Sequence, residues 1–156
     1  MQKIKQNNPL CSFRKEGGCY NQTMKAISSR RMHSVNLGCL FNVADNSGAK
    51  IARLVSVKHG KGRKGRQMCA GIGDFVKVSI RKGIPEMRKQ VFDAVIVRQK
   101  KEWRRLTGER IAFSDNAVAI LKDEKGEPKG TQIKGPIARE VSERWSSVAK
   151  LASIIV

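Results

Sequence analysis

The sequence predicts a mostly β fold, a small β-barrel with a helical cap at its C-terminal end. From Leu37 onward, short apolar runs rich in Val and Ile are interrupted by Gly, Asn and Asp, a pattern typical of all-β barrels and sandwiches. A helical spacing of apolar residues begins only after Gly135 and Pro136. Strands are therefore expected first along the chain and helices last.

The first three strands are predicted at residues 37–43, 51–58 and 75–80. Residues 44–48 (Ala-Asp-Asn-Ser-Gly) separate the first two as a turn, because Asx side chains bond their own backbone and Gly adopts positive φ. In the third, apolar residues alternate with charged or polar ones, which predicts one buried and one solvated face.

The middle of the chain supplies the remaining strands. Residues 91–99 are nearly all apolar at their centre, which predicts a central strand covered on both sides. Residues 103–106 and 109–113 flank Thr107 and Gly108, so we expect a projecting β-hairpin with a two-residue connection. Residues 116–122 form one further strand.

Two short helices are expected after a solvated loop at residues 124–130. Ile137, Val141 and Trp145 share one face of the first helix, with Pro136 in its first turn. The second helix has Ser147 as its N-cap. Its apolar side comprises Val148, Leu151, Ala152 and Ile155.

The charge limits the class of protein. The 156 residues include 32 Lys and Arg but only 13 Asp and Glu, a formal net charge of +19. Self-repulsion of this size favours a polyanionic partner, nucleic acid or an acidic membrane surface, and argues against a free-standing metabolic enzyme. No apolar run is long enough to span a membrane and no secretory leader is evident, so we expect a cytoplasmic protein.

Residues 1–23 differ from the rest because they lack apolar periodicity. We interpret them as a flexible N-terminal extension, and residues 24–156 as one domain. An RNA-binding arm is the alternative interpretation of the extension. Its cations would be Lys3, Lys5, Arg14 and Lys15.

The four cysteines predict neither a zinc site nor a disulfide framework. They lie at positions 11, 19, 39 and 69, without the closely paired spacing of structural zinc ligands. Reduced thiols are expected, with Cys39 and Cys69 as small buried side chains. A zinc site of Cys11, Cys19 and His33 is the less favoured alternative.

Basic residues concentrate in two candidate polyanion-binding regions. Residues 58–66 contain five Lys or Arg, three Gly and no acid, so their backbone can approach a phosphate surface closely. A solvated hairpin tip is the alternative. Between Arg81 and Arg105, nine cations accompany three acids. Trp103 lies among them and either stacks on an exposed base or packs on the barrel.

No catalytic constellation is evident. Both histidines lie beside basic residues and the carboxylates are scattered, so we expect no enzyme activity, cofactor or metal. Gly60, Gly62 and Gly65 match a dinucleotide-binding pattern, but a strand is predicted after them instead of a helix. A free-standing single-strand-binding barrel would need exposed aromatic residues, which are only 5% of the chain.

Several ordered motifs carry a resemblance to a known family. They are NVADNSGAK (42–50), GIGD (71–74), KGIPEMRKQV (82–91), AVIVRQ (94–99), Asp-Asn-Ala (115–117) and KGTQIKGPIARE (129–140). In this order they resemble the universal large-subunit ribosomal protein fourteen family over about residues 24–156. Residues 85–89 and the C-terminal residues 152–156 are more similar to archaeal and eukaryotic members than to bacterial ones.

The resemblance implies a five-stranded β-barrel and a structural constituent of the large ribosomal subunit. It also implies binding to large-subunit rRNA, contact with a neighbouring ribosomal protein, a bridge to small-subunit rRNA, and a C-terminal site for the anti-association initiation factor six. The residues implied to face rRNA are Asn46, Lys50, Lys58, Lys61, Arg63, Lys64, Arg66, Arg88, Lys89, Arg98, Lys100, Lys101, Arg104 and Arg105. The second basic region adds Arg81 and Lys82 as RNA-binding candidates. The implied protein-partner face comprises Arg139, Glu140, Glu143 and Trp145.

The chain departs from the family pattern in three places. Leu106 and Thr107 replace the usual residues before Gly108, which predicts a looser hairpin tip. Ala119 is smaller than the usual β-branched residue, which affects the packing of its strand. The segment starting at Met24 resembles a family N-terminus, so residues 1–23 are either a lineage-specific arm or the product of a start codon placed too far upstream.

Overall fold

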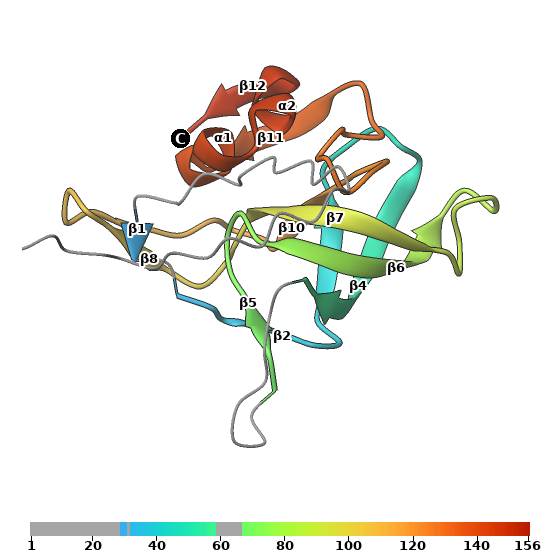
Figure 1. Cartoon of the computed structure of the whole chain (residues 1–156), viewed down its shortest axis with the longest axis horizontal. Helices are drawn as coiled ribbons and strands as arrows, with labels where there is room; N and C mark the ends of the chain where they lie inside the picture. The colour runs from blue at the N-terminus through green and yellow to red at the C-terminus, as the bar shows by residue number, and fades with distance from the viewer. Residues whose placement is uncertain (1–28, 31, 59–66) are drawn as a thin grey trace, which may run out of the picture.

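A computed structural model describes residues 29–30, 32–58 and 67–156 (Figure 1). Its centre is a closed barrel with the strand order β10-β3-β4-β6-β7, which confirms the predicted five-stranded barrel. The strands are β3 (Leu40–Val43), β4 (Ala49–Val57), β6 (Phe75–Gly83), β7 (Val91–Arg98) and β10 (Ala117–Ile120). Neighbours are antiparallel except for the parallel pair of β10 and β3. Closure leaves no unpaired edge in this sheet.

Strand β7 is covered on both sides, as its apolar sequence predicts. Ala94 and Ile96 belong to the core inside the barrel, together with Phe41, which is 1% exposed. Val95 and Val97 face the second core, between the barrel and the C-terminal elements. The alternation of side chains along a strand therefore lets one strand join two cores.

The projecting hairpin is present, with a different connection. β8 (Trp103–Arg105) and β9 (Arg110–Ile111) pair so that Arg105 lies opposite Glu109, which leaves a three-residue connection instead of two. Gly108 has φ of +93° and its N–H donates to the Arg105 carbonyl, as in a turn that ends in a left-handed residue. A further strand, β1 (Ser29–Arg30), pairs with β8 and was not expected from the sequence.

A second short ladder joins β2 (Val35–Asn36) to β5 (Cys69–Ala70). Cys39 and Cys69 are half-buried, not fully buried as predicted: Cys39 packs at the margin of the barrel core, and the Cys69 thiol donates to Asn36 Oδ1. Ala119 is fully buried in β10, so its strand packs closely despite the small side chain. Leu106, at the hairpin tip, is 78% exposed.

The C-terminal cap is part helix and part sheet. It comprises β11 (Ile133–Ile137), α1 (Arg139–Arg144), α2 (Ser146–Lys150) and β12 (Ala152–Ile155), and it lies on one side of the barrel (Figure 1). The prediction of Pro136 in the first helical turn is wrong, because Pro136 lies in β11, where it is aligned with Ile154 of β12 in a parallel ladder. Trp145, not Ser147, occupies the N-cap position of α2.

The second predicted helix is also shorter than expected. Ala152 and Ile155 belong to β12, and Ile155 is 47% exposed. Pairing with β11 supplies backbone hydrogen bonds that a continued helix would have made internally. No helix in the described residues is long and apolar enough to cross a membrane.

Candidate nucleic-acid interface

Some of the expected RNA-facing cations are bound by the chain's own acceptors. Arg98 makes a two-pronged ion pair with Asp115, with Nε–Oδ1 at 2.8 Å, and its guanidinium also donates to the Lys134 carbonyl. This hydrogen bond from Arg98 holds the pKa of the Asp115 carboxyl below its usual range, against the opposing effect of burial. Arg98 therefore fastens β7 to the loop before β10 and to β11.

Arg105 is the second of these bound cations. Its Nε donates to Oε1 of Glu140 at 2.8 Å, and its Nη2 donates to the Val156 carbonyl. The Glu140 carboxylate, 3% exposed, also accepts a hydrogen bond from Trp103 Nε1 at 2.9 Å. Burial opposes ionisation of Glu140, but the bonds from Arg105 and Trp103 outweigh it, so the pKa of Glu140 is lowered. This cluster ties the hairpin to α1.

Lys58 and Asn46 also have partners within the chain. Lys58 forms an ion pair with Glu124 and lies over the Phe75 ring, 4.7 Å from its centroid. The Asn46 amide donates to Thr131 Oγ1 and accepts from the Thr131 N–H, both at 2.9 Å. Asn46 therefore holds the loop before β11 against the turn after β3.

Eight other expected cations are exposed and have no carboxylate partner in the parts of the chain that the structure describes. They are Lys50, Arg81, Lys82, Arg88, Lys89, Lys100, Lys101 and Arg104. They lie on β4 and β6, on the loop that joins β6 to β7, and around the start of β8. Rigid strands thus position positive charge on several faces of the barrel, where it is open to an anion.

Arg53 belongs with these cations, although the sequence did not single it out. It lies exposed on β4 and forms no ion pair within the described residues. It escaped notice because it lies alone in an apolar run, whereas the sequence argument relied on clusters. Lys61, Arg63, Lys64 and Arg66 lie outside the described residues, as do Cys11 and Cys19.

The expected protein-partner face is only partly at the surface. Arg139 and Glu143 are exposed. Glu140 and Trp145 are buried, so their assignment to this face was wrong. Glu140 accepts hydrogen bonds from Arg105 and Trp103. The Trp145 ring stacks on Phe75, and its Nε1 donates to the Gly73 carbonyl. The helical spacing of Trp145 with Ile137 and Val141 therefore reflects its burial in the core. Trp103 likewise packs in this core, 2% exposed.

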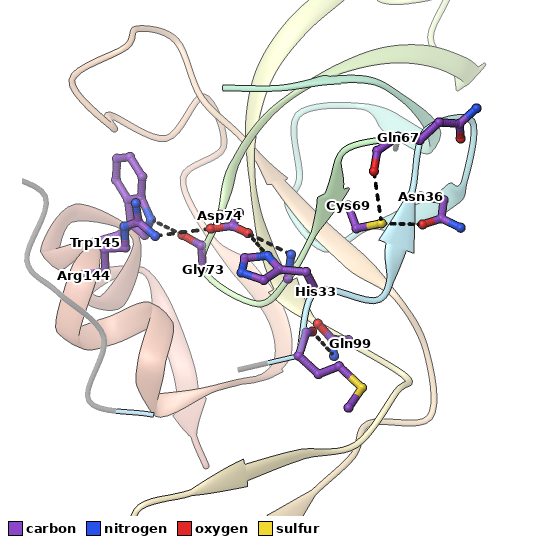
Figure 2. A network of polar contacts seen from close by, with 11 residues as sticks. His33, Asn36, Gln67, Cys69, Gly73, Asp74, Gln99, Arg144 and Trp145 are labelled. Carbon is purple, nitrogen blue, oxygen red and sulfur yellow. Dashed lines mark hydrogen bonds and ion pairs between the residues drawn. The ribbon is translucent and has the colours of Figure 1, made fainter. Parts of the chain in front are cut away.

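A second polar network anchors the segment before β2 (Figure 2). Asp74 accepts a hydrogen bond from the Gly71 N–H at 2.8 Å, and its carboxylate lies 3.2 Å from His33 Nδ1 and 3.3 Å from an Arg144 nitrogen. All three contacts join parts of the same chain, so this His and Asp pair has a structural explanation. No group of three or more His, Cys, Asp or Glu residues within the described ranges could hold a metal ion.

Fold and surface together define a strongly basic barrel protein whose acids stabilise its own structure and whose exposed cations are open to a polyanion. The model of the ribosomal protein L14p/L23e family matches residues 34–156. The chain belongs to this family, whose members are structural ribosomal proteins and not enzymes.

Curated archaeal relatives agree with the family match. The chain is 59% identical to the large ribosomal subunit protein uL14 of Nanoarchaeum equitans and 54% identical to that of Methanothrix thermoacetophila. It is 49% identical to the same protein of Halobacterium salinarum. Each comparison covers 133 residues, 85% of this chain and 100% of the relative. The resemblance drawn from the sequence motifs is thereby confirmed.

Proposed function

We propose that this chain is an rRNA-binding constituent of the large ribosomal subunit in the cytoplasm. The observation that carries the proposal is the set of exposed cations without carboxylate partners on the described barrel, in a chain of net charge +19. Phosphate groups are the ligand that this charge fits, because each contact releases counterions from the RNA. The names of the curated relatives support the same assignment.

The rRNA contacts are proposed for two sets of residues. The first is the exposed set of Lys50, Arg81, Lys82, Arg88, Lys89, Lys100, Lys101 and Arg104. The second is the basic run at residues 58–66, whose glycines permit close approach of the backbone. Arg98, Arg105 and Asn46 support the RNA-binding surface indirectly, since they hold the loops and hairpin beside it.

Protein contacts and the bridge to small-subunit rRNA are the finer part of the proposal. The C-terminal elements expose the charged Arg139 and Glu143 and also the apolar Ile154 and Ile155. A mixed polar and apolar surface suits a neighbouring large-subunit ribosomal protein or the anti-association initiation factor six. The exposed cations on the other faces suit the small-subunit rRNA.

Binding as a function of salt tests the rRNA contacts. The full chain should bind large-subunit rRNA with log affinity that falls linearly with log salt, by about 0.7 to 0.9 for each phosphate neutralised. It should also sediment with large subunits in a sucrose gradient. An affinity independent of salt, or absence from the large-subunit fractions, would refute the proposal.

A further inference from the structure

The outer wall of the barrel has an open depression that none of the contacts described above explains. Its volume is about 480 Å³ and it is lined by Leu37, Gly38, Arg53, Leu54, Val55, Ser79, Arg81 and Val91. The strand register explains why these residues meet. Leu40, Arg53, Ser79 and Val91 are successive cross-strand partners on β3, β4, β6 and β7. The depression is thus lined by three neighbouring hydrogen-bonded strands of the closed barrel, β4, β6 and β7, and by the segment before β3.

Two guanidinium groups lie at this depression without a carboxylate partner among the described residues. Arg53 is aligned with Ser79, and Arg81 lies two residues further along β6, where the ladder with β4 is irregular, so both arginines line the same depression. Asp93, on the adjacent β7, is paired with Lys77 instead. The two like charges therefore repel each other, and an anion bound between them relieves this repulsion.

The position of Arg53 is further defined by Gly38. Gly38 has φ of +85°, and a Cβ built on it would lie 3.4 to 4.0 Å from three atoms of the Arg53 guanidinium. The guanidinium therefore lies directly against this glycine, which is in the left-handed region that favours Gly. A planar group held in this way is ready for a two-pronged contact with phosphate.

The surface between the cations is apolar and open. Val55 and Val91 are 47% and 55% exposed, and Leu37 is 37% exposed. Branched aliphatic side chains on the outer face of the barrel offer contact area to the face of a planar ring. A base within a duplex cannot use such a surface, because its faces are already stacked on its neighbours.

We propose that this depression binds one unpaired RNA nucleotide, with its base over Val55 and Val91 and its phosphate between Arg53 and Arg81. The proposal rests on the proposed rRNA-binding function and extends it by naming the site and the kind of nucleotide. An acidic protein segment would also satisfy the two guanidiniums. The uncompensated positive charge of the surrounding surface favours RNA, because it continues well beyond the depression.

Binding measurements on the full chain separate the contribution of the two arginines from that of the apolar floor of the depression, Val55 and Val91. The double variant Arg53→Gln/Arg81→Gln should lose about tenfold or more in affinity for a short single-stranded RNA. The matched control, Lys122→Gln/Lys150→Gln, removes the same charge from exposed positions outside the depression and should lose less than about threefold. Unchanged urea unfolding midpoints for both variants establish that the fold is intact.

The floor variant Val55→Ser/Val91→Ser keeps all charges. It should weaken binding to the single-stranded RNA severalfold but leave binding to a duplex of the same sequence and to inorganic polyphosphate unchanged. Equal weakening for all three probes, or none, would overturn the nucleotide assignment. If the wild-type chain binds none of the three, the proposed function itself fails, which is a distinct outcome.

Crosslinking in assembled large subunits identifies the occupant directly. A photoreactive phenylalanine analogue in place of Val91 should crosslink to rRNA at an unpaired nucleotide, whereas the same analogue in place of Leu106, at the exposed hairpin tip, gives the background. A crosslink from position 91 to a protein, to a base-paired nucleotide, or at background level only, would refute the proposal even if the subunits contain the chain.

Discussion

Replacing Glu140 with Gln removes the charge from a carboxylate that is 3% exposed and accepts hydrogen bonds from both Trp103 and Arg105. The Arg105 side chain, 11% exposed, would then lack its ionic partner. Breaking a buried ion pair by removal of one partner costs about 3–5 kcal/mol. Gln retains one acceptor oxygen and Arg105 retains the Val156 carbonyl, so we expect the lower end, about 3 kcal/mol.

The pH dependence of this effect has a definite sign. The pKa of Glu140 is lower in the folded protein than its usual value, so its stabilisation is fully present above the unfolded-state pKa, about 4.3. The stabilisation is lost as the pH falls through the folded-state pKa. The difference in free energy of unfolding between wild type and Glu140→Gln should therefore be largest near neutral pH and decrease in acid.

Urea unfolding of the full chain at a series of pH values measures this difference. The control is Glu102→Gln, which breaks an ion pair with Arg110 whose side chains are 49% and 69% exposed, and which should cost no more than about 1 kcal/mol. A loss of less than about 1 kcal/mol for Glu140→Gln at pH 7, or a loss unchanged in strong acid, would show that the ion pair does not stabilise the hairpin and helix.

Two further changes test other elements of the scaffold. Asp115→Asn leaves Arg98 without its carboxylate partner and should lower the free energy of unfolding by about 1–3 kcal/mol at neutral pH. Because the pKa of Asp115 is also lowered, urea unfolding should show this loss decreasing in acid. A loss that stays constant with pH would contradict a stabilising role for the ion pair. Gly126→Ala places a Cβ 2.6 Å from the Trp145 ring at φ of +91° and should lower stability by about 2–3 kcal/mol in thermal unfolding. Gly108→Ala is its control, with φ of +93° but no atom within 4 Å, and an equal loss would exclude the ring contact as the cause.

The barrel could be predicted because its information is local. Alternation along β6 and the solid apolar centre of β7 report directly which faces are buried. The ladder of β11 and β12 could not be predicted in this way. Residues 137, 141 and 145 have helical spacing, yet Ile137 lies in a strand, because the pairing that fixes it involves the chain's last residues. Local periodicity carries no signal for such a partner.

The same limit applied to the candidate interface. Composition predicts that cations will be exposed, and for Lys50, Arg88 and Lys100 the structure places them at the surface. It cannot tell which cations the chain uses internally, because Arg105 and Glu140 are 35 residues apart in sequence and meet only through the packing of α1 on the hairpin. Arg53 shows the opposite failure, since only the sheet register brings it beside Arg81.

The charged residues have two separate roles, internal pairing and surface exposure, which explains how so basic a chain folds. Three of the buried or half-buried acids, Asp74, Asp115 and Glu140, are each paired with an arginine at a junction between elements. Such pairs lower local repulsion where segments must pack. The remaining repulsion lies on exposed strands and loops, where solvent and salt screen it. The proposed RNA binding would then remove this remaining cost without rearranging the core, so a folded barrel and a strong electrostatic affinity are compatible in one chain.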